Sequence, residues 1–268
     1  MSSPEIVACL KWVAHPGEPH DQRFAGPSPA DRAALELALQ QAKELGGTVT
    51  AVTVGPPATD TVLREALAAG AHRAIRVDGP GAMLSSDVAA AIAGVVEGAA
   101  WVWCGDYSLD RGTGSVPAFL AAALGAQQAL GVIDVQFATP GPAARVTRRL
   151  DGGRREVLDV TGPAVVSVEG AVADLRRAGL AALRAAGRGR IEVVALTTPA
   201  RRLKAVVQPY RPRAMAMAAP GGTSLDRLRA LTDAAAASAA RGETVTLAPP
   251  DAAARIVTAL GTWGYLDA

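Results

Sequence analysis

Apolar residues in the first two thirds of the chain form short runs separated by longer stretches of mixed character. The short runs are rich in Val, Ile, Ala and Trp and have the length of buried strands. The longer stretches place aliphatic residues at helical spacing. Such alternation predicts an α/β fold with a parallel sheet covered on both faces. The predicted strands are 5–10, 48–56, 74–77, 100–104 and 130–138, and the predicted helical segments are 28–47, 59–70, 86–97 and 116–124.

The first helical segment carries a complete set of end signals. Ser28 is suited to cap the helix, Pro29 has the fixed φ of a first turn, and Asp31 closes an S-x-x-D capping box. Gly46 is suited to end the helix in a left-handed conformation. These signals predict a helix that begins at Pro29.

The loop after the fourth predicted strand is the strongest candidate site. In a Rossmann-like sheet of order 3-2-1-4-5, the ligand crevice lies beyond the ends of strands one and four, which here are 9–12 and 105–115. Backbone N–H groups at Gly112, Thr113 and Gly114, followed by a helix N-terminus, favour a phosphate oxygen. Nearby groups can assist: Ser115 offers a hydroxyl, Arg111 a charge, and Asp110 an acceptor for a ribose hydroxyl or a helix cap. From these residues alone, a plain turn remains the alternative.

The pattern changes after residue 143. Segment 143–170 alternates with period two around Asp151-Gly152-Gly153, which predicts a β-hairpin added to the α/β domain. Segment 171–190 reads as a weak helix or an ordered loop, and 190–196 as a last strand. Residues 198–222 contain four prolines and predict an extended arm, followed by helices over 223–242 and 250–264. We therefore divide the chain into a 1–197 nucleotide-binding domain and a 198–268 arm that wraps on a partner.

Composition narrows the classes of partner. The chain has 268 residues with 27 basic and 25 acidic side chains, a balance that argues against a nucleic-acid surface. No apolar stretch approaches 18 residues, so no membrane span is predicted. Cys9 and Cys104 lie within apolar runs and share no metal-binding spacing, which predicts buried, reduced thiols. The N-terminus lacks the pattern of a signal peptide, and the high Ala, Arg and Gly content suggests a bacterial source. We predict a cytoplasmic protein.

The sequence is poor in catalytic residues. Its three histidines, His15, His20 and His72, have no metal-like or triad-like spacing. Neither Cys9 nor Cys104 has a general base nearby in the sequence. We therefore predict no catalytic residue and no metal ligand.

Five segments match, in order and spacing, the motifs of one family. "CLKWV" resembles its V-K-R-V, and "SPADRAALELALQQAKELGGTVTAVTVGP" its N/S-P-x-[DC]-x-x-A-[LV]-E-x-A start. "LREALAAGAHRAIRV" is similar to L-R-x-A-L-A-M-G-A-D-R-A-I-x-V, and "GDYSLDRGTGSVPA" aligns without a gap with G-K-Q-[SA]-I-D-G-D-T-G-Q-[VT]-G-P. "LDGGRREVLDVTGPAVVSVE" resembles the hairpin and the strand after it. The chain thus resembles the β subunit of electron transfer flavoproteins over residues 5 to 195.

This resemblance implies a function and a set of site residues. The protein would pair with an electron transfer flavoprotein α subunit, share one FAD with it, and carry electrons from dehydrogenases to a downstream acceptor. The β subunit would contribute a nucleotide pocket for AMP, or for a second FAD in bifurcating members. The nucleotide-binding positions carried over are Cys9, Ser28, Pro29, Ala30, Asp31, Val54, Asp110, Arg111, Gly112, Thr113, Gly114 and Ser115.

The chain departs from the family at the pocket loop and at the loop that docks on dehydrogenases. Asp106 and Tyr107 replace the Lys and Gln of the motif. In "AGLAALRAAGRGR", Leu180 and Leu183 are retained as candidate partner-binding residues, while the family's lysines are replaced. An exposed leucine suits a partner's pocket, and a core role is the alternative for Leu180.

Two rival functions are weighed against this one. A stand-alone adenine-nucleotide-binding regulatory module would use the same type of sheet, but it does not explain the hairpin and the proline-rich arm. An enzyme that activates a carboxylate or sulfur with ATP would need an S-G-G-type loop after the first strand, where the sequence reads "CLKWVAHPGEP".

Overall fold

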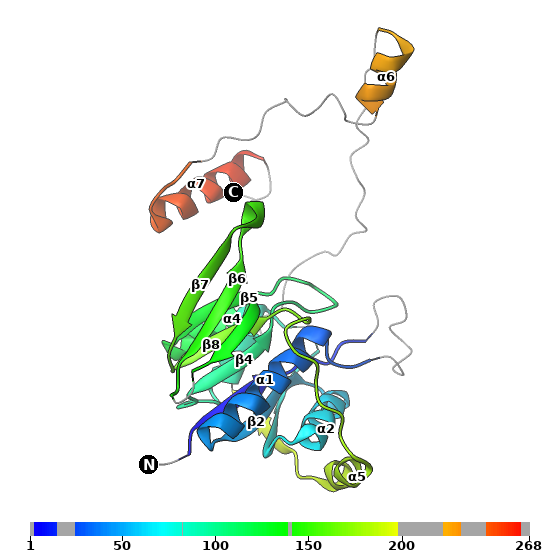
Figure 1. The fold of residues 1–268 in the computed structure, drawn as a ribbon, viewed down its shortest axis with the longest axis vertical. Coiled ribbons are helices and arrows are strands. Elements are labelled where there is room, and N and C mark those ends of the chain that lie inside the picture. Colours follow the sequence, from blue (N-terminus) through cyan, green and yellow to red (C-terminus); the bar gives the residue numbers. More distant parts are fainter. Residues whose placement is uncertain are drawn as a thin grey trace. The chain divides into compact units, whose positions relative to one another are not determined.

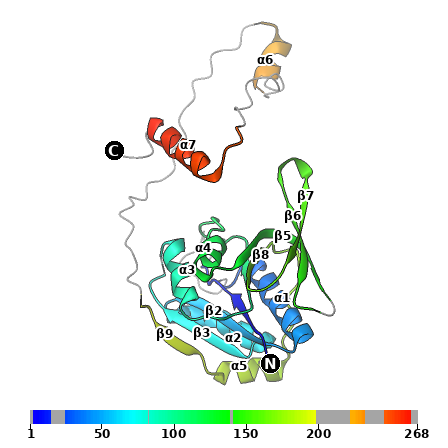
Figure 2. The same cartoon turned by 90° about the vertical axis from the view of Figure 1, so that its left-hand side faces the viewer.

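The computed structural model describes residues 3–14, 25–81, 83–138, 141–197, 222–231 and 245–263. The chain divides into two compact units, Met1–Ala205 and Val206–Ala268, and each is described by itself. The larger unit contains one nine-stranded sheet with helices on both faces (Figures 1 and 2). The expected α/β class is therefore confirmed.

The elements of the larger unit follow one another as the sequence pattern predicts. Its strands are β1 Glu5–Cys9, β2 Thr48–Gly55, β3 Arg73–Asp78, β4 Trp101–Gly105, β5 Gln127–Phe137, β6 Ala144–Arg149, β7 Arg155–Val160, β8 Ala164–Val168 and β9 Glu192–Ala195. Its helices are α1 Pro29–Leu45, α2 Asp60–Ala69, α3 Ser85–Ala93, α4 Val116–Leu124 and α5 Leu180–Arg188, with short 3₁₀ turns at Pro57–Thr59 and Asp151–Gly153.

The strand order corrects one detail of the expectation. The sheet reads β7-β6-β5-β8-β4-β1-β2-β3-β9, so the 3-2-1-4 portion is confirmed but β5 does not lie beside β4. Strand β8 lies there instead, parallel to both β4 and β5. The apolar run of β8 is buried along its whole length, as expected for an interior strand of a sheet whose two faces are covered.

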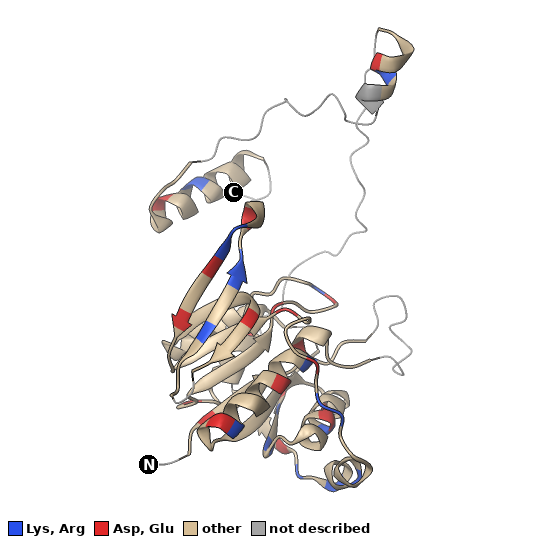
Figure 3. Ribbon diagram, in the orientation of Figure 1, with Lys and Arg blue, Asp and Glu red and all other residues tan. Residues whose placement is uncertain are grey.

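The hairpin is part of the same sheet rather than a separate addition. Strands β6 and β7 pair antiparallel across the predicted Asp151–Gly153 turn, where Gly152 and Gly153 have φ of 72° and 75°. Strand β5 connects the two parts, because it runs parallel to β8 and antiparallel to β6. Opposite charges face each other across the hairpin, as the alternating colours of Figure 3 show, with ion pairs Arg145–Asp159 and Arg148–Glu156.

Alternation along β1 and β4 divides their side chains between two cores. Ile6, Ala8, Trp101 and Trp103 face the helices α1 and α2, whereas the residues between them face α3 and α4. Few aromatic residues are available, yet two tryptophans occupy the first core. Trp101 and Trp103 stack with their centroids 5.8 Å apart, and the Trp103 indole N–H donates to Gln41 of α1 at 2.8 Å.

Helix α1 begins and ends as predicted. Ser28 is the N-cap, and its hydroxyl accepts a hydrogen bond from the Asp31 amide at 3.0 Å. The Asp31 carboxylate in turn accepts a hydrogen bond from the Ser28 amide. Gly46 ends the helix with φ of 61°. The capping box and the glycine stop are thus both confirmed.

Segment 171–190 contains both of the structures that the sequence left open. Residues 173–179 form an irregular strap that crosses α1, and α5 follows it. The Arg176 guanidinium makes two bonds to the buried Glu36 carboxylate of α1, at 2.8 and 2.9 Å, and the Arg176 amide makes a third. Arg64 of α2 donates to the backbone oxygens of Ala186 and Gly189 at the end of α5. These bonds hold the helix on the domain from both of its ends.

The smaller unit contains the helices α6 Ser224–Leu231 and α7 Pro249–Thr262. Asp226 and Thr223 form reciprocal bonds at the start of α6, and the rest of the predicted 223–242 helix lies outside the described residues. So do almost all of the 198–222 arm, His15 and His20. In the described part of the chain, no helix combines the length and apolar character needed to cross a membrane.

Candidate functional site: a pocket between strands β1 and β4

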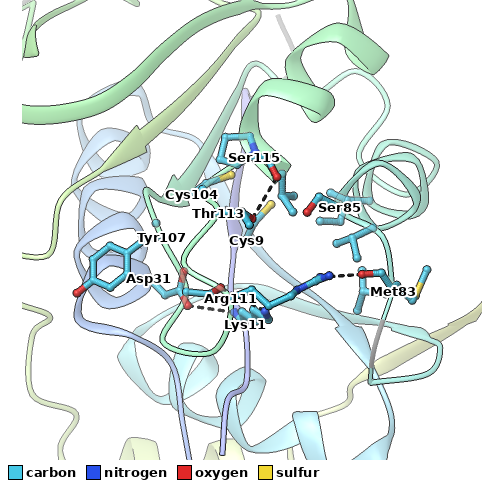
Figure 4. A pocket seen from close by; sticks show the side chains of 18 of the residues that line it. Cys9, Lys11, Asp31, Met83, Ser85, Cys104, Tyr107, Arg111, Thr113 and Ser115 are labelled. Carbon is cyan, nitrogen blue, oxygen red and sulfur yellow. Dashed lines mark hydrogen bonds between the residues drawn. The ribbon is translucent and has the colours of Figure 1, made fainter. Parts of the chain in front are cut away.

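A cavity of about 110 Å³ lies at the carboxyl ends of β1 and β4, where the predicted crevice falls. The first strand and the loop after β4 form one side, and the segment from Pro80 to Ile92 forms the other (Figure 4). Its apolar wall includes Val54, Met83, Val88 and Ile92. Polar groups come mainly from Lys11, Asp31, Arg111, Thr113 and Ser115.

Asp31 ties three pocket elements together. One carboxylate oxygen accepts from the amides of Lys11 and Ser28, at 3.2 and 3.4 Å, and the carboxylate also accepts from the Gly105 amide. The ends of β1 and β4 and the first turn of α1 therefore share one acceptor. Burial raises the pKa of this carboxyl to about 7 despite these bonds, because the charged form loses its hydration.

Gly105 is required for this arrangement. A Cβ at Gly105 would lie 2.6 Å from Asp31 Oδ1 and 2.9 Å from the Asp31 amide nitrogen. Any side chain there would push the helix start away from β4.

Lys11 and Asp110 connect the strand end to the loop after β4. The Lys11 ammonium donates to both Asp110 oxygens, at 2.6 and 2.7 Å, and to the Ser108 hydroxyl at 3.3 Å. The pKa of Asp110 is lowered to about 2 despite its partial burial, mainly through its bonds to Lys11 and Ser108. The Lys11 charge is thus already compensated by the protein.

Arg111 reaches across the pocket in the other direction. Its guanidinium donates to the Met83 carbonyl at 2.7 Å (Figure 4). Together with the Lys11–Asp110 pair, this bond fixes the loop at both sides of the cavity.

Two glycines shape the loop itself. Gly112 and Gly114 have φ of 62° and 56°, and the Gly112 amide donates to the Ser108 carbonyl at 2.9 Å. That amide is therefore used within the loop, and the phosphate-binding role predicted for it stays a prediction. A Cβ at Gly114 would lie 2.1 Å from the Asp106 carbonyl oxygen. Only a glycine at position 114 therefore allows the loop to pass this close to the Asp106 carbonyl group.

The N-terminus of α4 lines the same cavity, and its capping residue makes no bond to the helix backbone. Ser115 is the N-cap and makes no side-chain capping bond; its hydroxyl lies 3.2 Å from that of Thr113. Asp110 therefore does not cap α4, the second role considered for it. Two hydroxyls and a helix start remain directed at the pocket, an arrangement that suits an anion.

Asp106 brings a second carboxylate close to the loop. One of its oxygens is buried and has no hydrogen-bond partner among the described residues. Burial and the nearby Glu169 carboxylate raise its pKa. Asp106 thus places an acidic side chain where the motif of the resemblance has a lysine.

The structure brings part of the predicted nucleotide set to the cavity wall. The lining includes Cys9, Asp31, Val54, Arg111, Thr113, Gly114 and Ser115. Five predicted positions do not line the cavity. Ser28 is buried as the N-cap of α1, and Pro29 and Ala30 form the first turn of that helix beside Gly170. Asp110 pairs with Lys11, and Gly112 forms the turn of the loop. None of these placements tests binding, so the binding roles stay predictions.

The sequence analysis missed one whole wall. Pro80, Gly81, Met83, Ser85, Val88 and Ile92 line the cavity from the β3–α3 connection and α3. Considering only strands one and four left this wall out, although β3 also ends at this edge of the sheet. The "GPG" turn after β3 was the available signal. Lys11 also lines the cavity, although the resemblance of "CLKWV" to the family motif did not assign it a binding role.

The arrangement suits a ligand with a flat apolar part and an anionic part. Val54, Met83, Val88 and Ile92 offer apolar contact, while Arg111, the two hydroxyls and the α4 start offer donors and positive potential. The residues present are thus compatible with an adenylate. In the described part of the chain, no group of three or more His, Cys, Asp or Glu side chains gathers as a metal site.

Fold and pocket together define a doubly wound α/β domain with a ligand pocket at its topological switch point. Residues 21–199 match the family model described as "Electron transfer flavoprotein domain". Protein FixA of Azorhizobium caulinodans is 34% identical over 210 residues, which cover 70% of this chain and 73% of that protein. The chain belongs to the electron transfer flavoprotein domain family.

Proteins named as β subunits are among its relatives. The electron transfer flavoprotein subunit β of Methylophilus methylotrophus is 28% identical over 165 residues, covering 60% of this chain and 62% of that protein. The one from Mycobacterium bovis is 31% identical over 170 residues, covering 61% and 62%. The chain thus spans less than two thirds of each of these two relatives. Family membership gives it a role in electron transfer within a flavoprotein family.

Proposed function

We propose that this chain is the β subunit of a two-subunit electron transfer flavoprotein. It associates with an α subunit to hold one FAD, accepts electrons from dehydrogenases through that FAD, and passes them to a downstream acceptor. FAD supplies the redox chemistry when bound. This chain positions it and forms part of the docking surface, acting as an electron carrier in the cytoplasm rather than as an enzyme with catalytic residues of its own.

The β1–β4 pocket is the observation that carries the proposal. It lies at the switch point, within a domain that matches the family, and it combines an apolar wall with cationic and hydroxyl groups. We assign it to an adenine nucleotide, AMP or the adenylate part of a second FAD. Arg111, Thr113, Ser115 and the α4 start would hold phosphate, and Val54 and Met83 would contact the base. Lys11 contributes fully only if its bond to Asp110 loosens.

Helix α5 supports a dehydrogenase-docking role. Leu180 is 66% exposed and Leu183 is 51% exposed, so the core alternative for Leu180 does not apply. The segment 176–190 contains five arginines and no acidic residue, and these positions are blue in Figure 3. An exposed leucine pair on a helix held at both ends is preorganised to enter an apolar pocket with an acidic rim.

The 198–268 arm is assigned to the α subunit. Within the smaller unit, Ile256, Val257 and Trp263 of the α7 region are each more than half exposed. Apolar side chains on an amphipathic helix are suited to a groove on another protein. Together with the proline-rich arm that precedes them, they support a role in wrapping the partner subunit.

Co-expression with an electron transfer flavoprotein α subunit from the same genome tests the proposal. We expect a stable complex that carries flavin absorbance, whereas the chain alone is colourless. Denaturing release followed by chromatography identifies the second nucleotide. The Leu180→Ser/Leu183→Ser double variant should keep its flavin but lose electron transfer from the cognate dehydrogenase. Val157→Ser, at a residue 59% exposed on the hairpin, is the matched control and should retain transfer. A chain that binds neither flavin nor any α subunit contradicts the proposal.

A further inference from the structure

The two cysteines of the chain lie side by side at the floor of the pocket. Cys9 and Cys104 are register partners on the adjacent parallel strands β1 and β4. Register partners point to the same face of a sheet, so both thiols face the core that contains α3 and α4. Figure 4 shows both sulfur atoms close together, on the side of the pocket where Thr113 and Ser115 lie.

Both thiols are free, and both reach the cavity. Cys9 is 8% exposed and Cys104 is 4% exposed, and each lines the pocket. The Cys104 thiol hydrogen-bonds with Cys9, and this contact together with burial raises the pKa of Cys104 well above its ordinary value. A protonated thiol is a slow nucleophile, so the Cys104 thiol resists reagents that need a thiolate.

We propose that Cys9 and Cys104 form a two-thiol site for a thiophilic ligand that makes two bonds to sulfur, with a trivalent arsenical as its probe. Adjacent strands are spaced about 4.8 Å apart in the hydrogen-bonding direction. One large atom bonded to both sulfurs spans register partners at this spacing. The second bond forms within the same site, so the effective concentration of the second thiol is high.

The reaction with an organic arsenic(III) oxide balances without an oxidant. Each sulfur forms one As–S bond and gives up its proton. The two protons leave with the arsenic oxygen as one water molecule, and arsenic remains trivalent. A bridged arsenical occupies the floor between β1 and β4, so it excludes a nucleotide from the same space. This exclusion rests on the proposed function, whereas formation of the adduct does not.

Intact-mass spectrometry of the full-length chain tests the site. Reduced protein is treated with phenylarsine oxide and then challenged first with excess 2-mercaptoethanol and next with 2,3-dimercaptopropanol. We expect one arsenical per wild-type chain, stable to the monothiol and removed by the dithiol. Cys9→Ala and Cys104→Ala should each lose the arsenical to the monothiol about 100-fold faster or more. Cys9→Val and Cys104→Val, which suit a buried strand, provide a second set.

Two outcomes overturn the inference. The first is folded wild-type protein that yields no monothiol-resistant adduct, and the second is a single variant that retains one; in both cases the thiols do not act as a pair. The nucleotide is measured separately, by its release from the complex before and after the arsenical. Full retention of nucleotide beside a bridged arsenical overturns the exclusion alone, and a complex that never held nucleotide counts against the proposed function but not against the two-thiol site.

Discussion

The two ends of the central sheet each carry a hollow, and the larger one has the poorer chemistry. At the amino ends of β4 and β8 a cavity of about 540 Å³ is lined by residues such as Leu45, Val96, Trp101 and Leu124. At the carboxyl ends, the β1–β4 pocket measures about 110 Å³. The larger lining contains no charged side chain among the described residues, whereas Lys11, Asp31 and Arg111 line the smaller.

This difference follows from chain direction rather than from size. In a parallel sheet, the carboxyl ends lead into loops and helix N-termini, which present amides and positive potential. The amino ends receive helix C-termini and short apolar connections such as Ala99–Ala100 and Gly162–Pro163. The larger cavity therefore lies at the amino end of the sheet, and the charged side chains line the smaller one at the carboxyl end.

Gly114→Ala should have the largest effect on the nucleotide content of the pocket. Its Cβ would lie 2.1 Å from the Asp106 carbonyl oxygen, at a φ of 56°, so the loop cannot close. We expect retained nucleotide to fall more than about tenfold and stability to drop by about 1–3 kcal/mol. Gly98→Ala is the matched control, since Gly98 lines the other hollow, has φ of 83° and has nothing within 4 Å of an added Cβ. Its loss of stability should leave nucleotide content unchanged; equal nucleotide loss in both variants contradicts the assignment.

Asp31 should make the stability of the domain depend on pH. Its carboxyl has a pKa of about 7 in the folded chain and 3.8 as its ordinary value. Between these values the unfolded chain binds fewer protons, so stability falls as pH rises from about 4 to about 7, by up to about 4 kcal/mol. Above pH 7 both states are ionised and this contribution to the slope ends. Urea unfolding followed by tryptophan fluorescence measures it, and Asp31→Asn should remove the slope. An unchanged slope in the variant contradicts this cause.

Asp110→Asn should change ligand affinity more modestly. The substitution removes the charge that compensates Lys11, so a phosphate ligand gains a free cation. We expect the affinity of the complex for AMP to rise about fivefold at low salt and less at high salt. Isothermal titration of nucleotide-stripped complex measures the change, and Lys11→Met should lower affinity. Weaker binding by the Asp110→Asn variant would instead indicate that the carboxylate contacts the ligand directly.

Ala126→Leu should have the smallest effect. Ala126 lines the amino-end cavity, where extra methylene groups have space. We expect stability to change by less than about 1 kcal/mol, with nucleotide and flavin content as in the wild type. Thermal unfolding and nucleotide release provide the two measurements. Loss of nucleotide from this variant would mean that the two ends of the sheet are coupled.

Much of the fold was readable from local signals. The Ser28–Asp31 capping box, Gly46 and the Asp151–Gly153 turn each act through neighbouring residues, and each is confirmed. The place of β8 was not readable, because an apolar run specifies burial on both faces but not which strands flank it. The burial of Trp101 and Trp103 in one core depends on the register of β4 against β1.

The position of the pocket in the sheet could be predicted from the sequence, but only some of the residues that line it could be. Strand order placed the loop after β4 beside the end of β1. The partners of Asp110 and Gly112 depend on side-chain reach and on the loop path, which local sequence does not reveal. The Met83 wall was missed because it arrives from a third strand, through a contact that spans 28 residues along the chain.

The strap across α1 gives the domain a mechanical route between its surface and its interior. Arg176 of the strap bonds to Glu36 of α1, and five residues earlier the same helix contributes Asp31 to the ends of β1 and β4. A displacement of the strap that precedes α5 would therefore act on the helix that holds these strand ends together. If dehydrogenases dock on Leu180 and Leu183 as proposed, they would bind a segment that is joined through α1 to the pocket assigned to the nucleotide.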